Sequence, residues 1–149
     1  MQNLRPCVWA LTAALLCFGV YAAAEPTKIA PEAAAPLLNS DKTVLGQPLA
    51  YPKDAANVMA NIATMQPGEE TEWHQHDVPM FGYILEGEVM VDYGQQGKRL
   101  YRQGDAIIEA IGTPHRGRNT GSVPTKILSV FMGAKGSPNT TLLPGYFPQ

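Results

Sequence analysis

Three histidines are the residues of this sequence best placed to do chemistry. The chain holds only three, and two of them, His74 and His76, are separated by a single residue. Side chains alternate between the two faces of a β-strand, so these two imidazoles would point the same way. The third, His115, follows Gly112-Thr113-Pro114 at the start of another expected strand. Imidazole suits zinc, copper and iron, so the three residues are candidate metal ligands. The alternative for His74 and His76 is a pair of solvent-facing histidines on a hairpin.

Met80 lies four residues after His76, where a hard divalent metal would favour an acidic ligand. Its thioether is neutral and soft, which suits copper(I) better than manganese, magnesium or ferric iron. In one interpretation Met80 is a fourth ligand in a copper centre. In the other it is apolar packing, and the metal keeps open positions for water or substrate. Either way we expect a divalent transition metal, namely iron, copper or zinc.

Two carboxylates are candidates for a catalytic role beside the histidines. Glu72 shares strand parity with His74 and His76, and Glu109 lies on the segment that leads to His115. Either would act as a general base or fix the tautomer of an imidazole. The alternative for each is a solvated carboxylate at the rim of the site.

The elements that must position these residues are short strands. Segments rich in β-branched and aromatic residues alternate with Gly or Pro, and no stretch after residue 57 keeps a helical period, so we predict an all-β domain. The expected strands are 58–65, 71–76, 81–86, 88–93, 98–102, 105–110, 115–119 and 125–132. Strand parity directs Arg116 and Arg118 away from the cavity and puts Asn119 on the face of His115. The apolar side chains expected to face inward are those of Met80, Ile84, Ala106 and Ile108.

The spacing around the histidines resembles the two motifs of the cupin superfamily, in the manner of small single-domain cupins. The first motif is matched by Gly68, His74, His76, Met80 and Gly87, and the second by Gly104, Ala110, Gly112, His115 and Asn119. There are two departures: the family usually has a glutamate ligand at the position of Met80 and a proline at that of Ala110. The resemblance covers roughly residues 57–132. It implies a double-stranded β-helix, or jelly-roll barrel, in which the three histidines converge, and it implies a possible homodimer.

The first 24 residues have the pattern of a signal peptide. Arg5 forms a short basic end, an uncharged and mostly apolar run follows from residue 7 to residue 20, and small residues at positions 22 and 24 suit cleavage before Glu25. We therefore expect a periplasmic or secreted protein with no membrane association after cleavage. The alternative is a retained anchor over residues 7–24, which is at the short end of what spans a bilayer.

The rest of the chain divides into three parts by composition. A Pro- and Ala-rich lead covers residues 25–56, the expected barrel covers 57–132, and a polar tail covers 133–149. Cleavage would remove both cysteines, Cys7 and Cys17, which excludes a disulfide framework and a cysteine nucleophile from the mature protein. The chain has 13 acidic residues and 11 basic ones without a basic cluster, which argues against nucleic acid as a partner.

Three functions fit these features. The first is an exported metalloenzyme with a three-histidine site acting on a small organic molecule; the resemblance includes cupin dioxygenases that use three histidines alone around iron. The second is a non-catalytic periplasmic protein that binds copper or another metal. The third is a cupin without metal that binds a small ligand. The fold alone does not choose among them, because this barrel supports unrelated activities.

Overall fold

The computed structural model describes residues 27–28, 30 and 34–148. It divides the chain into two units, residues 1–34 and 35–149. In the first unit the described residues form no helix or strand. The expected signal peptide and its retained-anchor alternative both fall outside the described residues. Within the described ranges, no helix has the length and apolar character needed to cross a bilayer.

The regular secondary structure in the described part of the second unit consists almost entirely of β-strands. These are β1 (Ala56–Met65), β2 (His74–His76), β3 (Met80–Glu86), β4 (Glu88–Asp92), β5 (Lys98–Arg102), β6 (Ala106–Ile108), β7 (Arg116–Arg118), β8 (Thr125–Ala134) and β9 (Thr140–Leu142), with one short 3₁₀ helix, η2 (Gly94–Gln96). The all-β prediction is confirmed. All eight expected strands are present, and β9 is an additional strand in the tail.

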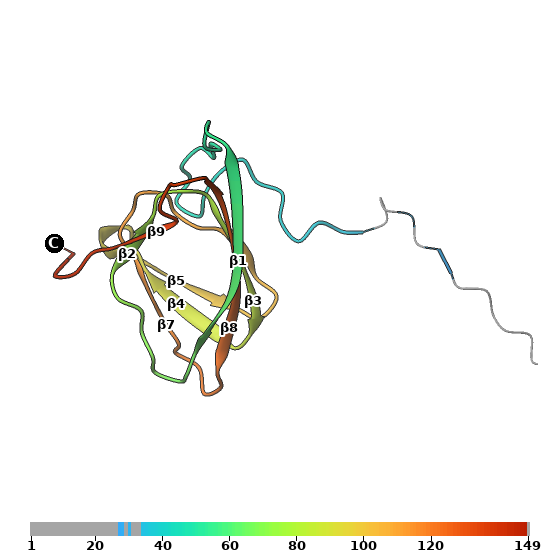
Figure 1. Ribbon diagram of the computed structural model, residues 1–149. Coiled ribbons are helices and arrows are strands. Elements are labelled where there is room, and N and C mark those ends of the chain that lie inside the picture. The colour runs from blue at the N-terminus through green and yellow to red at the C-terminus, as the bar shows by residue number, and fades with distance from the viewer. Residues whose placement is uncertain (1–26, 29, 31–33, 149) are drawn as a thin grey trace, which may run out of the picture. The chain divides into compact units, whose positions relative to one another are not determined.

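The strands form three sheets, with orders β1-β8-β3-β6, β5-β4-β7 and β2-β9. In Figure 1 the sheet that holds β1, β8 and β3 faces the one that holds β4, β5 and β7. No continuous ladder closes the three sheets into one. Isolated bridges lie beside them instead: His74 of β2 pairs with His115, the residue before β7, and Glu70, which lies outside the strands, pairs with Arg118 of β7. The seam between sheets therefore runs through two of the three histidines.

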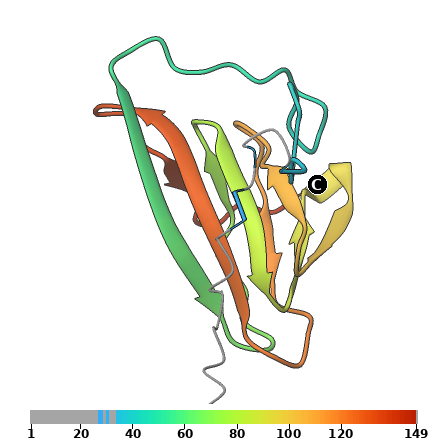
Figure 2. The ribbon, with the colours of Figure 1, turned by 90° about the vertical axis from the view of Figure 1, so that its right-hand side faces the viewer.

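The longest ladder joins the two ten-residue strands β1 and β8, which lie side by side along their length in Figure 2. β1 is an edge strand, and its side chains Val58 and Ile62 are 66% and 59% exposed. On its other edge β8 pairs with β3, in a register that places Met80 opposite Phe131. This pairing brings two apolar side chains from distant parts of the chain to the interior.

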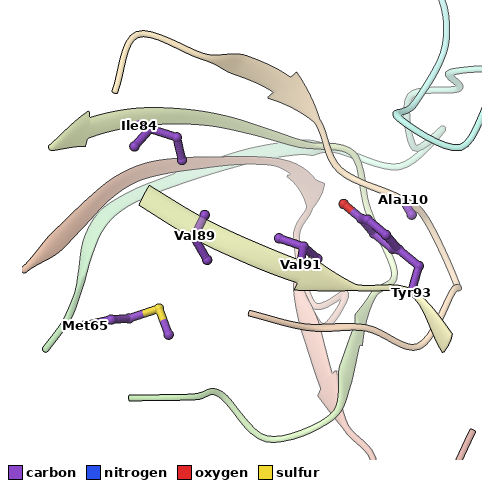
Figure 3. Close-up of a cluster of buried hydrophobic side chains, with 6 residues drawn as sticks. All are labelled: Met65, Ile84, Val89, Val91, Tyr93 and Ala110. Atoms are coloured by element: carbon purple, nitrogen blue, oxygen red, sulfur yellow. The ribbon is translucent and has the colours of Figure 1, made fainter. Parts of the chain in front are cut away.

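The main apolar core lies between the two larger sheets. It consists of Met65, Ile84, Val89, Val91, Tyr93 and Ala110 (Figure 3). Three of these residues, Val89, Val91 and Tyr93, alternate along β4 and its end, as the period of a strand with one buried face requires. The aromatic ring of Tyr93 is 2% exposed, so β4 delivers a phenol deep into the interior.

The tight turn between β3 and β4 depends on Gly87. Its φ is +73°, a conformation that residues with a side chain rarely adopt. A Cβ at this position would also lie 2.8 Å from the Pro124 carbonyl oxygen and 2.9 Å from Thr125 Oγ1. Glycine thus allows the hairpin to pack against the start of β8, which fixes the direction in which β4 leaves β3.

Candidate metal centre

Backbone pairing brings His74 and His115 together from segments 41 positions apart in the numbering. The His74 N–H donates to the His115 carbonyl oxygen at 3.0 Å, and the His115 N–H donates to the His74 carbonyl oxygen at 2.8 Å. His76, two residues along β2, is anchored through its own carbonyl oxygen, which accepts from the Gly112 N–H at 2.8 Å. Because paired residues in antiparallel segments lie on the same face, the imidazoles of His74 and His115 emerge side by side.

The three imidazoles form a compact cluster. Their ring centroids are 5.2 Å apart for His74 and His76, 4.5 Å for His74 and His115, and 5.0 Å for His76 and His115. One ring nitrogen from each lies within 4.8 Å of the others. His76 and His115 are 4% and 2% exposed, and His74 is partly buried. A cluster of this kind is able to hold one metal ion.

The second ring nitrogen of each histidine is engaged away from the cluster. Nδ1 of His74 bonds to the Glu72 carbonyl oxygen at 2.8 Å, and Nδ1 of His115 bonds to the Thr113 carbonyl oxygen at 2.8 Å. A carbonyl only accepts, so in both rings Nδ1 carries the proton and Nε2 carries the lone pair. Nδ1 of His76 lies 3.1 Å from Thr140 Oγ1. Such partners fix the tautomer and orientation of metal-binding histidines, so the donor set fits a transition metal.

The surroundings also keep the rings uncharged. Burial lowers the pKa of His74 and of His115, and it lowers the pKa of His76 from 6.5 to about 3, with smaller effects from its two histidine neighbours. Only a neutral imidazole has a lone pair for a metal, so the three residues are in the ligating form at neutral pH.

Acidification should destabilise the metal-free protein through His76. Between its folded pKa of about 3 and its ordinary value of 6.5, the unfolded chain binds a proton that the folded chain does not. The stability that depends on this residue is therefore complete above pH 6.5 and falls as the pH decreases, by about 1.4 kcal/mol per pH unit for one proton.

Urea unfolding at several pH values measures this slope. His76→Gln has no titratable ring, so its free energy of unfolding should fall less steeply on acidification than that of the wild type. The two slopes should differ by up to about 1.4 kcal/mol per pH unit, the contribution of one proton. Equal slopes in the two proteins would show that His76 titrates in the folded state as freely as in the unfolded chain.

The histidines border a cavity of about 420 Å³, a size that suits a small organic ligand. Its apolar walls include Met80, Ile84, Ile107 and Phe131. The expected inward orientation is confirmed for Met80 and Ile84 but is wrong for Ala106 and Ile108. In the pairing of β3 with β6, Gly82 faces Ile107 and Phe81 faces Ile108, so Ile107 shares the inner face and Ile108 the outer one.

Met80 is buried within the cavity wall. It packs with Val78 and Phe131 in a small apolar cluster and is 7% exposed. These apolar contacts show that the Met80 side chain packs in the cavity wall. Whether its sulfur also binds a metal stays a prediction.

The two candidate carboxylates lie in different places. Glu72 is exposed and precedes β2, which begins only at His74, so the strand parity that predicted its inward orientation does not extend to it. Its contribution to the centre is the carbonyl oxygen that holds His74. Glu109 is 3% exposed and lines the cavity beside the histidines, so the alternative of a solvated rim carboxylate is wrong for this residue.

Residues around His115 stabilise the segment that carries it. Asn119 is 1% exposed, and its Nδ2 donates to the carbonyl oxygens of Met65 at 2.9 Å and Val123 at 2.8 Å. Arg116 points away from the cavity, where it forms an ion pair with Glu70 at 2.6 Å and lies over the ring of Trp73. The parity of this strand is therefore as expected.

Two residues of the site, Thr140 and Tyr93, were not identified from the sequence. Thr140, which holds His76, belongs to the three-residue strand β9 in a tail that we expected to be polar and irregular. Tyr93, whose ring centroid is 5.7 Å from that of His115, ends an expected strand. Its parity with Val89 and Val91 was the one available sign that it faces inward.

Comparison with known proteins agrees with this arrangement. A family model described as "Cupin domain" matches residues 61–131, which include all three histidines. No curated protein matches the chain. The oxalate decarboxylase of Lactobacillus farciminis, solved as a formate complex, is 24% identical over 58% of this chain and 26% of its own, with a TM-score of 0.50. The DMSP lyase DddQ of Ruegeria pomeroyi DSS-3 is 26% identical over 65% of this chain and 46% of its own, with a TM-score of 0.50.

These structural likenesses confirm the jelly-roll fold. They extend over only part of the two neighbours, because this chain spans about a quarter of the decarboxylase and less than half of the lyase.

Proposed function

Because this chain belongs to the cupin superfamily, with its cupin domain at residues 61–131, we propose that it is a metal-binding cupin whose centre is His74, His76 and His115. The observation that carries the proposal is the shared orientation of the three rings. Each Nδ1 has a partner outside the cluster, while one ring nitrogen from each residue gathers within 4.8 Å of the others. A mere packing cluster of buried histidines has no need of this common orientation.

The donor set favours iron, copper or zinc. Three neutral imidazoles suit these borderline ions, whereas manganese, magnesium and calcium favour oxygen ligands. Such an ion would supply Lewis acidity and open coordination positions. The chain's own residues hold the ion, keep the imidazoles neutral by burial, and surround one side of it with apolar walls.

The enzymatic form of this proposal is a dioxygenase-type cupin that acts on a small organic molecule. Its support is the cavity of about 420 Å³, which has apolar walls, three histidines and one buried carboxylate, Glu109. Apolar walls around a few polar groups are typical of sites that orient a small substrate and limit its access to water.

The second candidate function is non-catalytic binding of copper or another metal, and Met80 favours it. A thioether in the cavity wall, close along the chain to His76, offers the soft ligand that copper(I) prefers. Met80→Glu replaces this sulfur by a charged oxygen donor. We expect the relative affinity for manganese or iron(II) over copper(I) to rise by at least about tenfold, because ligand softness decides this preference. Competition titrations of the three ions measure it; unchanged selectivity would show that the side chain at position 80 does not touch the ion.

We also propose that residues 1–24 direct the protein to the periplasm and are then removed. One purification tests the location and the function together. The protein isolated from the periplasm of its own bacterium should begin at Glu25 and contain close to one metal ion per chain. Iron(II) that binds nitric oxide at open positions would support the dioxygenase form, and copper with a sulfur ligand would support the binding form. A protein that takes up no metal under any loading condition would contradict both forms and leave the binding of a small ligand alone.

A further inference from the structure

Glu109 is a buried carboxylate that forms no ion pair among the described residues, although the positive charge of Arg99 lowers its pKa by less than burial raises it. It is 3% exposed and lines the cavity beside the three histidines. The ion pairs among the described residues join Lys98 and Arg116 to Asp92, Arg102 to Glu88, Arg116 to Glu70 and Lys126 to Glu86, and none includes Glu109. Burial raises the pKa of this carboxyl, which means that the surroundings disfavour its charge. A buried charge with no direct ion pair costs several kcal/mol in general, so an acid at this position needs an explanation.

The hydrogen bonds of Glu109 hold one oxygen and leave the other free. Oε1 accepts from the Tyr93 hydroxyl at 2.7 Å and from the Ala110 N–H at 2.7 Å. A phenol has a single proton, so the contact of 3.3 Å between the hydroxyls of Tyr93 and Tyr101 must have Tyr101 as donor. The chain of donors thus runs from Tyr101 through Tyr93 to Oε1. Among the described residues none donates to Oε2.

A glutamine at position 109 would accept the hydrogen bonds of Oε1 at a lower free-energy cost of burial. The carbonyl oxygen of a glutamine accepts the same two hydrogen bonds and carries no charge to bury. The hydrogen bond from Tyr93 therefore does not explain why position 109 holds an acid instead of an amide. A cation in the cavity, which Glu109 and the three histidines line together, would explain it.

The position of Glu109 beside Met80 indicates that this cation is the metal ion of the three-histidine site. The Glu109 N–H donates to the Met80 carbonyl oxygen at 2.9 Å, so the two residues are neighbours on adjacent segments of one sheet, and both line the cavity. The cupin motif that this sequence resembles has an acid at the position of Met80. This chain therefore has no negative charge at position 80 on β3, but it has one at Glu109, on the segment that pairs with β3.

We propose that Glu109 is the countercharge for a divalent cation held by His74, His76 and His115, and that Tyr93 positions it. The inference rests on the proposed metal site. Oε1 is fixed by its two donors, and Oε2 supplies the negative charge to the cavity. With Glu109 ionised, the net charge of the occupied site falls from 2+ to 1+, which offsets the burial of both the ion and the carboxylate. Glu109 is not one of the three residues whose donor atoms lie within 4.8 Å of one another, so its role is electrostatic, beside the ligands.

Zinc titration of the Glu109→Gln variant tests this proposal, with Glu69→Gln as the matched control. The substitution keeps the acceptor for Tyr93 and Ala110, removes the charge, and replaces Oε2 by an amide NH2 of similar size. We expect the zinc Kd to rise by about tenfold or more, as for the removal of other groups that support metal ligands. The thermal midpoint of the metal-free variant should equal or exceed that of the wild type, because a buried charge is gone. Glu69 is exposed and lies outside the cavity, and its variant should bind zinc as the wild type does.

A merely structural Glu109 would give a different pattern. The metal-free Glu109→Gln variant would then melt at a lower temperature, or its zinc Kd would be that of the wild type, and either result overturns the proposal. Tyr93→Phe gives a second test: it should weaken zinc binding less than Glu109→Gln does, and the double variant should be no weaker than Glu109→Gln alone, since Tyr93 acts through Glu109. Additive losses would overturn the positioning role. If the wild type itself bound no zinc, the proposed metal site would fail, a result distinct from equal binding by wild type and variant.

Discussion

Replacing His115 by alanine should raise the Kd for zinc by at least about 100-fold. Removal of a group that only supports a metal ligand typically costs 10- to 100-fold in affinity, so loss of a ligand itself should reach or exceed the upper end of that range. The backbone bonds that pair residue 115 with His74 do not involve the imidazole, so the two segments stay in register in the variant. The effect should therefore appear in metal affinity while the strands remain assembled.

Competition with a chelator of known zinc affinity measures this Kd, and circular dichroism checks the fold. Gln75→Ala is the matched control, because Gln75 lies on β2 between two of the histidines and bonds to Asp77 at 3.0 Å instead of joining the cluster. Its zinc affinity should stay within about twofold of the wild type. A His115→Ala protein that binds zinc like the wild type would remove this residue from the centre.

Asn119→Ala should lower the free energy of unfolding by about 3 kcal/mol, since each buried polar group left without a partner costs about 1–3 kcal/mol. The side chain makes three hydrogen bonds, to the carbonyl oxygens of Met65 and Val123 and from the Gly121 N–H at 2.9 Å. With alanine at position 119, these three backbone groups lose their hydrogen-bond partner. The change also frees the end of β1 from the segment that follows His115.

Equilibrium unfolding in urea measures the effect, with an unchanged slope against urea concentration showing that the loss is one of stability. Asn57→Ala removes an exposed asparagine from β1 and should change the free energy of unfolding by no more than about 0.5 kcal/mol. A loss below about 1 kcal/mol for Asn119→Ala would mean that water or a shifted backbone satisfies the freed groups.

The strands were predictable because their signals are local. Alternating apolar residues and the Gly and Pro residues between them marked most strands of the two larger sheets, and the short Arg-Gly-Arg strand β7 was placed by the turn residues on either side of it. The strand β9 was missed because three residues, Thr140–Leu142, have no period to detect, and their pairing with β2 is a contact across more than sixty positions.

Parity predicted side-chain direction only where a strand is regular and its face is known. It succeeded for Met80 and Ile84 on β3. It failed at Glu72, which precedes its strand, and on β6, where the adjacent Ile107 and Ile108 give no alternation of polarity. The burial of Glu109 could not be predicted from the sequence, because the Tyr93 hydroxyl that holds it comes from the end of β4, in the neighbouring sheet.

The measurement that tests the central claim most directly is the X-ray absorption spectrum of the zinc-loaded protein. A centre formed by His74, His76 and His115 predicts three imidazole nitrogens at about 2.0–2.1 Å from the metal. His76→Ala should reduce the fitted number of imidazoles to two. A wild-type spectrum that fits two imidazoles or fewer would contradict the claim that these three residues share one ion.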